Sequence, residues 1–264
     1  MEPWPGRRAP APPLNDLTTR FVARLRSRDP QAWFELWEIF GPVLRAQLAR
    51  WGGGRIGVET VQDLSQETMA ALASAIDRHD PSRGARFSTW LLAIARYTLG
   101  DELDRRSAQK RGSGRRARPL DDAPSPTDGR PGPGQTYERD VFDAKVEAAL
   151  RAVEREVGFV DFEVFRQRVL EGKSGRSVAA ALGVSEPTVS RRLSAVRGRL
   201  RDQLRDIVAR YSFTQEEIDE PARNGLELIP NKRDEAAFDD AVADIYHRIC
   251  QRRATQAAAA RREG

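Results

Sequence analysis

The chain has 264 residues, with 44 Lys and Arg against 39 Asp and Glu, a net charge of +5 and a pI of about 9.8. Its length predicts roughly two domains, and its basic balance favours a polyanionic partner. Cys250 is the only cysteine, and His79 and His247 are the only histidines. An intrachain disulfide is therefore excluded, and neither a metal site nor a cofactor is expected. No apolar run reaches the length of a membrane span, so we expect a cytoplasmic protein without membrane insertion.

Charge is distributed unevenly along the chain. Residues 96–118 and 166–205 are strongly basic, whereas Glu and Asp dominate residues 215–244. Basic blocks that are separated from an acidic block indicate distinct surfaces rather than general solubility.

The N-terminal part is helical after a short tail. Residues 1–15 are rich in proline and lack periodicity, which predicts a disordered tail. Apolar residues at helical spacing then predict a helical domain over residues 16–106. Turn residues divide it at Asp29-Pro30, at Gly52-Gly53-Gly54 and in the loop 79–84, and its last two helices are expected over residues 58–75 and 87–106.

Three further segments follow this domain. Residues 107–138 consist largely of Gly, Pro, Ser and Arg without an apolar stripe, which predicts a flexible linker. Helical periodicity resumes over residues 139–211 and returns in one amphipathic helix within the acidic extension 212–264. The expected fold class is all-α, with two small helical domains joined by a flexible linker, the second containing a helix-turn-helix, and a helical C-terminal extension.

The stretch SVAAALGVSEPTVSRRLSAVRGRL, residues 177–200, has the pattern of a helix-turn-helix. Gly183 suits a left-handed turn, Ser185 the N-cap of a second helix, and Pro187 its first turn. Ala179 is small enough to let the two helices cross closely. The expected buried stripe of the second helix consists of Val189, Leu193, Val196 and Leu200. Its opposite, basic face can lie in the major groove of DNA, whereas the alternative is an ordinary helical hairpin with a solvated face.

Aromatic and basic residues are interleaved at the start of the helix expected from residue 87. Arg86, Phe87 and Trp90 flank small polar residues, and Arg96 and Tyr97 follow along the helix. Such a pattern suits single-stranded nucleic acid, because rings stack on unpaired bases while Arg side chains hold the backbone. Core packing of the Phe and Trp rings is the alternative interpretation.

The preceding helix carries a polar face. Asp63, Gln66 and Glu67 are spaced i, i+3 and i+4, which places all three on one side of a helix. By residue type alone, such a face is a solvated surface.

Taken in this order, these segments resemble the sigma-70 family of RNA polymerase sigma factors. The similarity rests on QDLSQETMAAL (residues 62–72), DPSRG (residues 80–84), RFSTWLLAIAR (residues 86–96) and the distal helix-turn-helix. The layout is similar to the small, extracytoplasmic-function-like group, with a C-terminal extension. The resemblance implies a non-enzymatic subunit that binds core polymerase, recognises promoter DNA and promotes transcription initiation.

The resemblance also implies roles for individual residues. Asp63, Gln66 and Glu67 are implied in docking on the clamp helices of the polymerase largest subunit. The residues implied in promoter melting and minus-ten recognition are Arg83, Arg86, Phe87, Trp90, Arg96, Tyr97, Asp101, Arg105 and Arg106. Those implied in minus-thirty-five recognition are Thr188, Ser190, Arg191, Arg192 and Arg197. Within the last set, Arg197 is expected to meet phosphate rather than base edges.

Under this resemblance, residues 16–106 correspond to sigma region 2 and residues 139–211 to region 4. The expected partners are bacterial core RNA polymerase, through its clamp helices and flap region, and promoter DNA, with an anti-sigma factor as a further candidate. Tyr97 stands where small sigma factors often carry Asn, and residues 107–138 replace region three. The acids of residues 119–128 could mimic RNA phosphates near the template strand, and an inert tether is an equal alternative.

Two other classes of protein remain as alternatives. A stand-alone helix-turn-helix transcriptional regulator is the main one, but it leaves the pattern from Asp63 to Trp90 unexplained. A DNA-cleaving recombinase or transposase is disfavoured, because no acidic triad or supported nucleophile occurs at interpretable spacing. The acidic extension after Tyr211 has three open roles: covering a basic DNA-binding face, contacting another partner, or stabilising the second domain.

Overall fold

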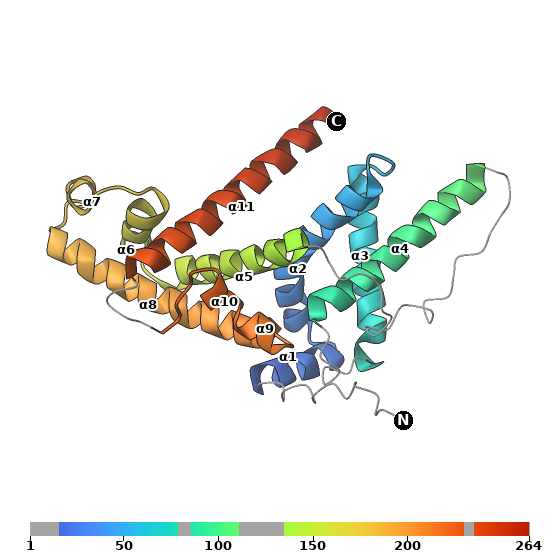
Figure 1. Cartoon of the computed structure of the whole chain (residues 1–264), viewed down its shortest axis with the longest axis horizontal. Coiled ribbons are helices and arrows are strands. Elements are labelled where there is room, and N and C mark those ends of the chain that lie inside the picture. The colour runs from blue at the N-terminus through green and yellow to red at the C-terminus, as the bar shows by residue number, and fades with distance from the viewer. Residues whose placement is uncertain (1–15, 79–85, 111–134, 230–234, 264) are drawn as a thin grey trace, which may run out of the picture.

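The computed structural model describes residues 16–78, 86–110, 135–229 and 235–263. These residues form helices and connecting turns, without a strand among them, which confirms the all-α class (Figure 1). The expectations for the 1–15 tail, for Arg83 and for the central part of the linker lie outside the described residues. None of the described helices combines the length and the apolar character of a membrane span.

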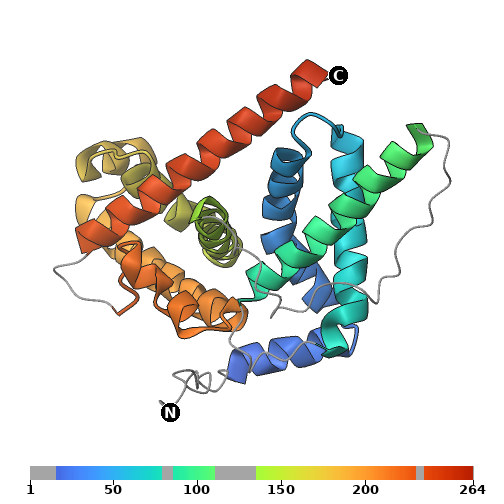
Figure 2. The ribbon, with the colours of Figure 1, turned by 45° about the vertical axis from the view of Figure 1, so that its right-hand side comes forward.

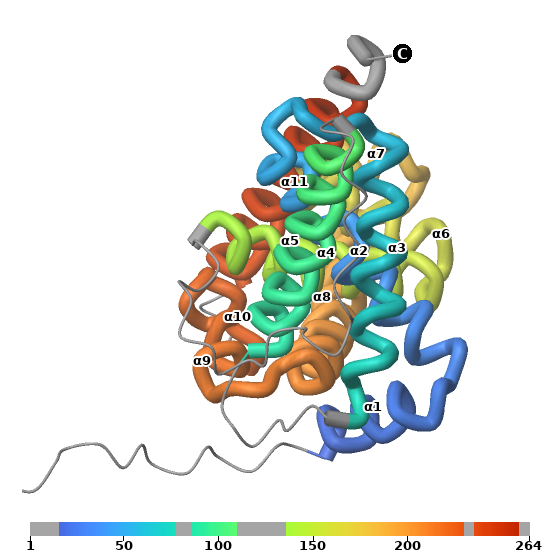
Figure 3. The backbone as a smooth tube through the Cα atoms, turned by 90° about the vertical axis from the view of Figure 1, so that its right-hand side faces the viewer, coloured from blue at the N-terminus to red at the C-terminus, as the bar shows by residue number. Residues whose placement is uncertain are grey.

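The first helices form an N-terminal bundle in which α2, α3 and α4 pack on one another. Helix α1 lies across one end of this bundle (Figure 2), and α3 and α4 run side by side (Figure 3). The elements of the bundle are α1 (Asp16–Arg26), α2 (Pro30–Gly52), α3 (Val58–Ala75), the short 3-10 helix η1 (Ile76–Arg78) and α4 (Phe87–Lys110). Helix α4 continues four residues beyond the limit expected at residue 106.

The remaining helices form a C-terminal group built around α8. This helix packs on α5, α6 and α7, while α11 packs on α5 and on the π-helix η4. The elements are α5 (Gln135–Glu156), α6 (Phe159–Phe165), η4 (Arg166–Leu170), α7 (Gly175–Leu182), α8 (Glu186–Tyr211), α9 (Gln215–Ile218), α10 (Glu220–Arg223) and α11 (Glu235–Glu263). Because α5 begins at Gln135, both ends of the segment expected as a linker are helical.

Local signals in the sequence explain where α2 begins and ends. The Asp29 side chain accepts a hydrogen bond from the Gln31 N–H, and Pro30 occupies the first turn, where its missing N–H costs nothing. At the other end Gly53 has a φ of 53°, and its N–H donates to the Ala49 carbonyl. Glycine adopts this left-handed conformation without a steric penalty, so the helix ends there.

Aromatic rings join the N-terminal bundle to the C-terminal group. Tyr211, at the end of α8, lies edge-on to Phe21 of α1 and Phe40 of α2, with ring centroids 4.8 and 6.0 Å apart. Thr18 of α1 donates a hydrogen bond to the Ala209 carbonyl at 2.6 Å. A single hydrophobic core therefore extends from α1 to α11, and the two predicted helical domains share it.

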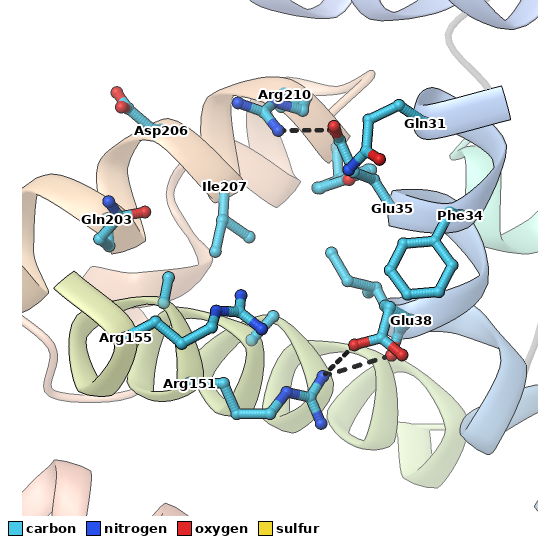
Figure 4. Close-up of a pocket in the computed structure, with 14 residues that line it drawn as sticks. Gln31, Phe34, Glu35, Glu38, Arg151, Arg155, Gln203, Asp206, Ile207 and Arg210 are labelled. Carbon is cyan, nitrogen blue, oxygen red and sulfur yellow. Dashed lines mark hydrogen bonds and ion pairs between the residues drawn. The ribbon is translucent and has the colours of Figure 1, made fainter. Parts of the chain in front are cut away.

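Ion pairs surround a cleft of about 270 Å³ between α2, α5 and α8 (Figure 4). Arg210 pairs with Glu35 at 2.9 Å, and Arg151 pairs with Glu38 at 3.8 Å. Each pair links the N-terminal bundle to the C-terminal group. Phe34 lies on the same cleft and is 57% exposed.

Helix α2 continues through Pro42. Because proline has no N–H, the carbonyl of Glu38, four residues earlier, lacks its helical hydrogen bond. Nη2 of Arg151, in α5, donates to that carbonyl at 3.4 Å. A side chain from the C-terminal group thus replaces the donor that the proline removes.

Replacing Arg151 with alanine should remove this donor and lower the free energy of unfolding by about 1 kcal/mol. In a Pro42→Ala background the backbone N–H is restored, so the same replacement should cost clearly less. Urea unfolding of the four proteins in this double-mutant cycle measures the difference. Equal costs in both backgrounds would mean that Arg151 acts only through its ion pairs.

Candidate nucleic-acid interface

Helices α7 and α8 are joined by a short turn with well-defined caps. Ser174 accepts a hydrogen bond from the Ser177 N–H at the start of α7. Gly183 ends α7 with a φ of 64°, and the Ser185 side chain accepts from the Thr188 N–H at the start of α8. Ala179 is buried, and α7 packs on α8. The caps fix the direction in which α8 leaves the turn.

One face of α8 is buried and the other faces solvent. The buried face consists of Val189, Leu193, Val196 and Leu200. On the opposite side Ser190 and Arg191 are exposed near the start of the helix, while Thr188 is half-buried. A helix with polar and basic side chains exposed at its N-terminal end has the chemistry needed to reach base edges in a major groove.

Two other arginines of α8 are engaged within the protein. Arg192 forms an ion pair with Asp161 of α6. Arg197 forms ion pairs with Glu235 at 2.7 Å and with Asp239, both in α11, and its side chain is 12% exposed. Burial disfavours the charge of Arg197, but these carboxylates raise its pKa above the ordinary value. Arg197 therefore carries its charge and is covered by α11.

The polar residues predicted on α3 share one exposed face. Asp63, Gln66 and Glu67 are all exposed, whereas Val61 and Leu64 are buried on the other side of the helix. This face leaves two carboxylates and an amide available to a partner.

The two aromatic residues predicted in promoter melting are buried. Phe87 is 1% exposed and Trp90 is 3% exposed. The Phe87 ring stacks on Phe213 of the C-terminal extension, with centroids 5.3 Å apart, and lies edge-on to Phe40 and Trp90. In this arrangement both rings are part of a core, and neither surface is open to a base.

Arg86, directly before α4, is also covered. Its side chain is 15% exposed and pairs with Glu138 at 3.2 Å and with Glu216 at 2.8 Å. Burial acts against its charge, but these acidic neighbours raise its pKa above the ordinary value. Glu216 belongs to the extension, so the extension holds both Arg86 and Phe87.

Further along α4, one of the predicted minus-ten residues lies over an aromatic ring and two others line a cleft. Arg96 is exposed and lies over the Trp51 ring, 5.1 Å from its centroid. Tyr97 and Asp101 line a cleft of about 230 Å³ together with Glu67 of α3. The predicted promoter-binding and polymerase-binding residues therefore meet at this cleft.

Two arginines near the end of α4 are tied to other side chains. Arg105 and Arg106 both pair with Glu102, at 2.7 and 2.6 Å. Arg106 also donates to Thr60 of α3 at 2.7 Å. These contacts orient the guanidinium groups along the outer part of α4.

Several residues that matter at this surface escaped the sequence interpretation. Phe213 and Glu216 cover one predicted DNA-binding element, and Glu235 and Asp239 cover another. The only signal in the sequence was the acidic character of the extension, which does not say which basic residues it contacts. Within the described part of the chain, no group of three or more His, Cys, Asp or Glu residues is arranged to hold a metal ion.

Comparison with known proteins gives a family for the N-terminal bundle. No curated protein matches the chain. One solved structure that matches is titled as CnrH in complex with the cytosolic domain of CnrY; it has 24% sequence identity and a TM-score of 0.29, and the match covers 72% of this chain and 97% of that chain. Residues 36–109, from within α2 to the last turn of α4, match the family model of sigma-70 region 2. The N-terminal bundle thus contains a region similar to sigma-70 region 2.

Proposed function

We propose that the protein is a sigma factor of the small, extracytoplasmic-function-like group, which directs core RNA polymerase to promoters and promotes initiation. The observation that carries this proposal is the match to sigma-70 region 2. It spans both the exposed polar face of α3 and nearly all of α4. The proposed role is non-catalytic, and we assign it to the cytoplasm, where bacterial polymerase works.

The polar face of α3 is proposed as the polymerase contact. Asp63, Gln66 and Glu67 are exposed together and would dock on the clamp helices of the largest subunit. The C-terminal group would contact the flap region. An anti-sigma factor is a further proposed partner, which would compete for one of these surfaces.

Helix α4 is proposed to recognise and melt the minus-ten element. Tyr97 and Asp101 on the cleft would face the element, with Arg96 near its backbone. The full proposed set is Arg83, Arg86, Phe87, Trp90, Arg96, Tyr97, Asp101, Arg105 and Arg106. Because Phe87 and Trp90 are buried, their use on an unpaired strand requires the surrounding core to open.

Helix α8 is proposed to read the minus-thirty-five element. Ser190 and Arg191 are exposed at its N-terminal end, with Thr188 beside them. An arginine at this position can make two hydrogen bonds to one guanine. Arg192 and Arg197 are proposed as phosphate contacts, which position the helix without reading sequence.

A stand-alone helix-turn-helix regulator is the second candidate, and the exposed start of α8 favours it equally. It predicts tight binding to duplex DNA without polymerase. A pull-down with core polymerase, followed by transcription from a promoter library, separates the two. Failure to bind core polymerase and to direct initiation would remove the sigma-factor proposal.

The double variant Asp63→Ala/Glu67→Ala should weaken binding to core polymerase by about tenfold or more, because two carboxylates are lost from an interface. Promoter recognition by the C-terminal group should be unchanged. Surface plasmon resonance with immobilised core polymerase measures the effect. The matched control is Asp240→Ala/Asp244→Ala, which removes two exposed acids at the same spacing from α11. Equal losses in both variants would contradict the assignment of the α3 face.

Arg191→Ala should lower discrimination at the minus-thirty-five element by about 1–3 kcal/mol while leaving binding to core polymerase intact. Transcription from promoters with altered minus-thirty-five sequences measures this discrimination. Arg199→Ala serves as control, because Arg199 is also exposed but lies about two turns further along α8. A uniform loss across all promoter sequences would make Arg191 a phosphate contact instead.

A further inference from the structure

The C-terminal extension, residues 212–264, contacts both proposed DNA-binding elements of its own chain. Its first residues lie against the start of α4, and the start of α11 lies against α8. Helices α9 and α10 lie between these two contacts in the sequence. One continuous segment thus reaches both ends of the proposed promoter-binding surface.

At the start of α4, the extension places a ring and a carboxylate on the melting segment. Phe213 is 3% exposed and stacks on Phe87 at an interplanar angle of 21°. Glu216 pairs with Arg86 at 2.8 Å. The position of both residues is fixed locally, because Glu217 and Thr214 form a capping box at the start of α9. A stacked ring and an anion are the same two contacts that a single-stranded nucleic acid would make.

At α8, the extension places carboxylates on an arginine proposed to bind phosphate. Nε of Arg197 donates to Asp239 at 2.8 Å, and Nη1 donates to Glu235 at 2.7 Å. The neighbouring Arg201 lies over the Phe238 ring, 4.3 Å from its centroid. The Arg197 guanidinium makes three charged hydrogen bonds, and two of them, from Nε and Nη2, go to the two oxygens of Asp239. The paired donors that would bind a phosphate are therefore already used. DNA and α11 therefore compete for Arg197.

Between these contacts, a lysine and a glutamate of opposite charge are buried too far apart to form a hydrogen bond. Lys145 of α5 is fully buried, and its Nζ lies 3.9 Å from Glu220 of α10. Nζ makes no hydrogen bond within the described residues. Burying two charges at such a distance costs free energy that their attraction recovers only in part. Release of the extension separates this pair and returns Glu220 to water, which lowers the cost of opening.

We infer that the extension is an intramolecular inhibitor, which occupies the start of α4 and Arg197 of α8 in the free protein and is displaced when promoter DNA binds. This inference rests on the proposed promoter-binding function. Of the three roles that the sequence left open for the extension, this inference selects the covering of a basic DNA-binding face. In this closed state the chain binds DNA weakly, and opening exposes both elements together.

The first test measures binding of a fluorescein-labelled, random-sequence DNA duplex by anisotropy, without polymerase. Glu235→Gln/Asp239→Asn should tighten DNA binding by about fivefold or more. Fivefold is the lower end of the change in affinity that one site typically causes at another. The salt dependence of log Kd should become steeper by about 0.9 for each additional phosphate that the protein binds. The control Asp240→Asn/Asp244→Asn makes the same change in net charge on exposed residues of α11. Equal affinities and slopes in the two variants would overturn the inference.

The second test addresses the contact at the start of α4. Glu216→Gln should tighten binding to a single-stranded oligo(dT) more than Asp219→Asn, which removes one exposed charge from the same short segment. Affinities that change by the same factor in both variants would mean that general charge, not release of Arg86, controls binding.

A third measurement uses the unaltered full chain and does not depend on the folding of any variant. Saturating duplex DNA should speed amide hydrogen exchange in α11, because displacement removes its contacts with α8. Unchanged exchange in α11 at saturation would overturn the inference. Tighter DNA binding by Glu235→Gln/Asp239→Asn, together with no polymerase-dependent transcription by either the variant or the unaltered chain, would instead refute the sigma-factor proposal and leave the covering contact in place.

Discussion

The packing of Tyr211 is the contact on which the arrangement of the molecule depends. Its ring ends α8 and contacts Phe21 and Phe40 from the N-terminal bundle. Each such aromatic pair contributes about 0.5–1.5 kcal/mol beyond the area it buries. Phe213 follows two residues later and extends the same cluster to Phe87. The cluster that joins the two helical groups therefore also closes the start of α4.

Several helix limits could be predicted from sequence because local chemistry determines them. Asp29 before Pro30 starts α2, and Gly53 and Gly183 end α2 and α7 in left-handed conformations. The buried stripe of α8 followed directly from helical spacing. The ends of the linker were less predictable, since α4 and α5 continue into a segment of poor apolar periodicity.

Local sequence patterns could not predict whether the residues of the candidate site are exposed or covered. The residue types at Phe87 and Arg197 suggested nucleic-acid contacts, and both side chains are instead covered by residues far away in sequence. No local pattern specifies that Glu235 and Asp239 face Arg197 rather than another basic residue. Such pairings follow from the route of the chain through space, which a single sequence with helical periodicity does not reveal.

Helix α8 is one uninterrupted helix of 26 residues. A helix of that length extends roughly 39 Å and bends little. Its N-terminal end carries Arg191, and its C-terminal end holds Tyr211 in the aromatic cluster. Because the two residues lie near opposite ends of α8, a small rotation of the helix about Tyr211 would move Arg191 through a much larger distance. Through this long helix, the aromatic cluster sets the distance between α4 and the start of α8, the two elements proposed to read the promoter.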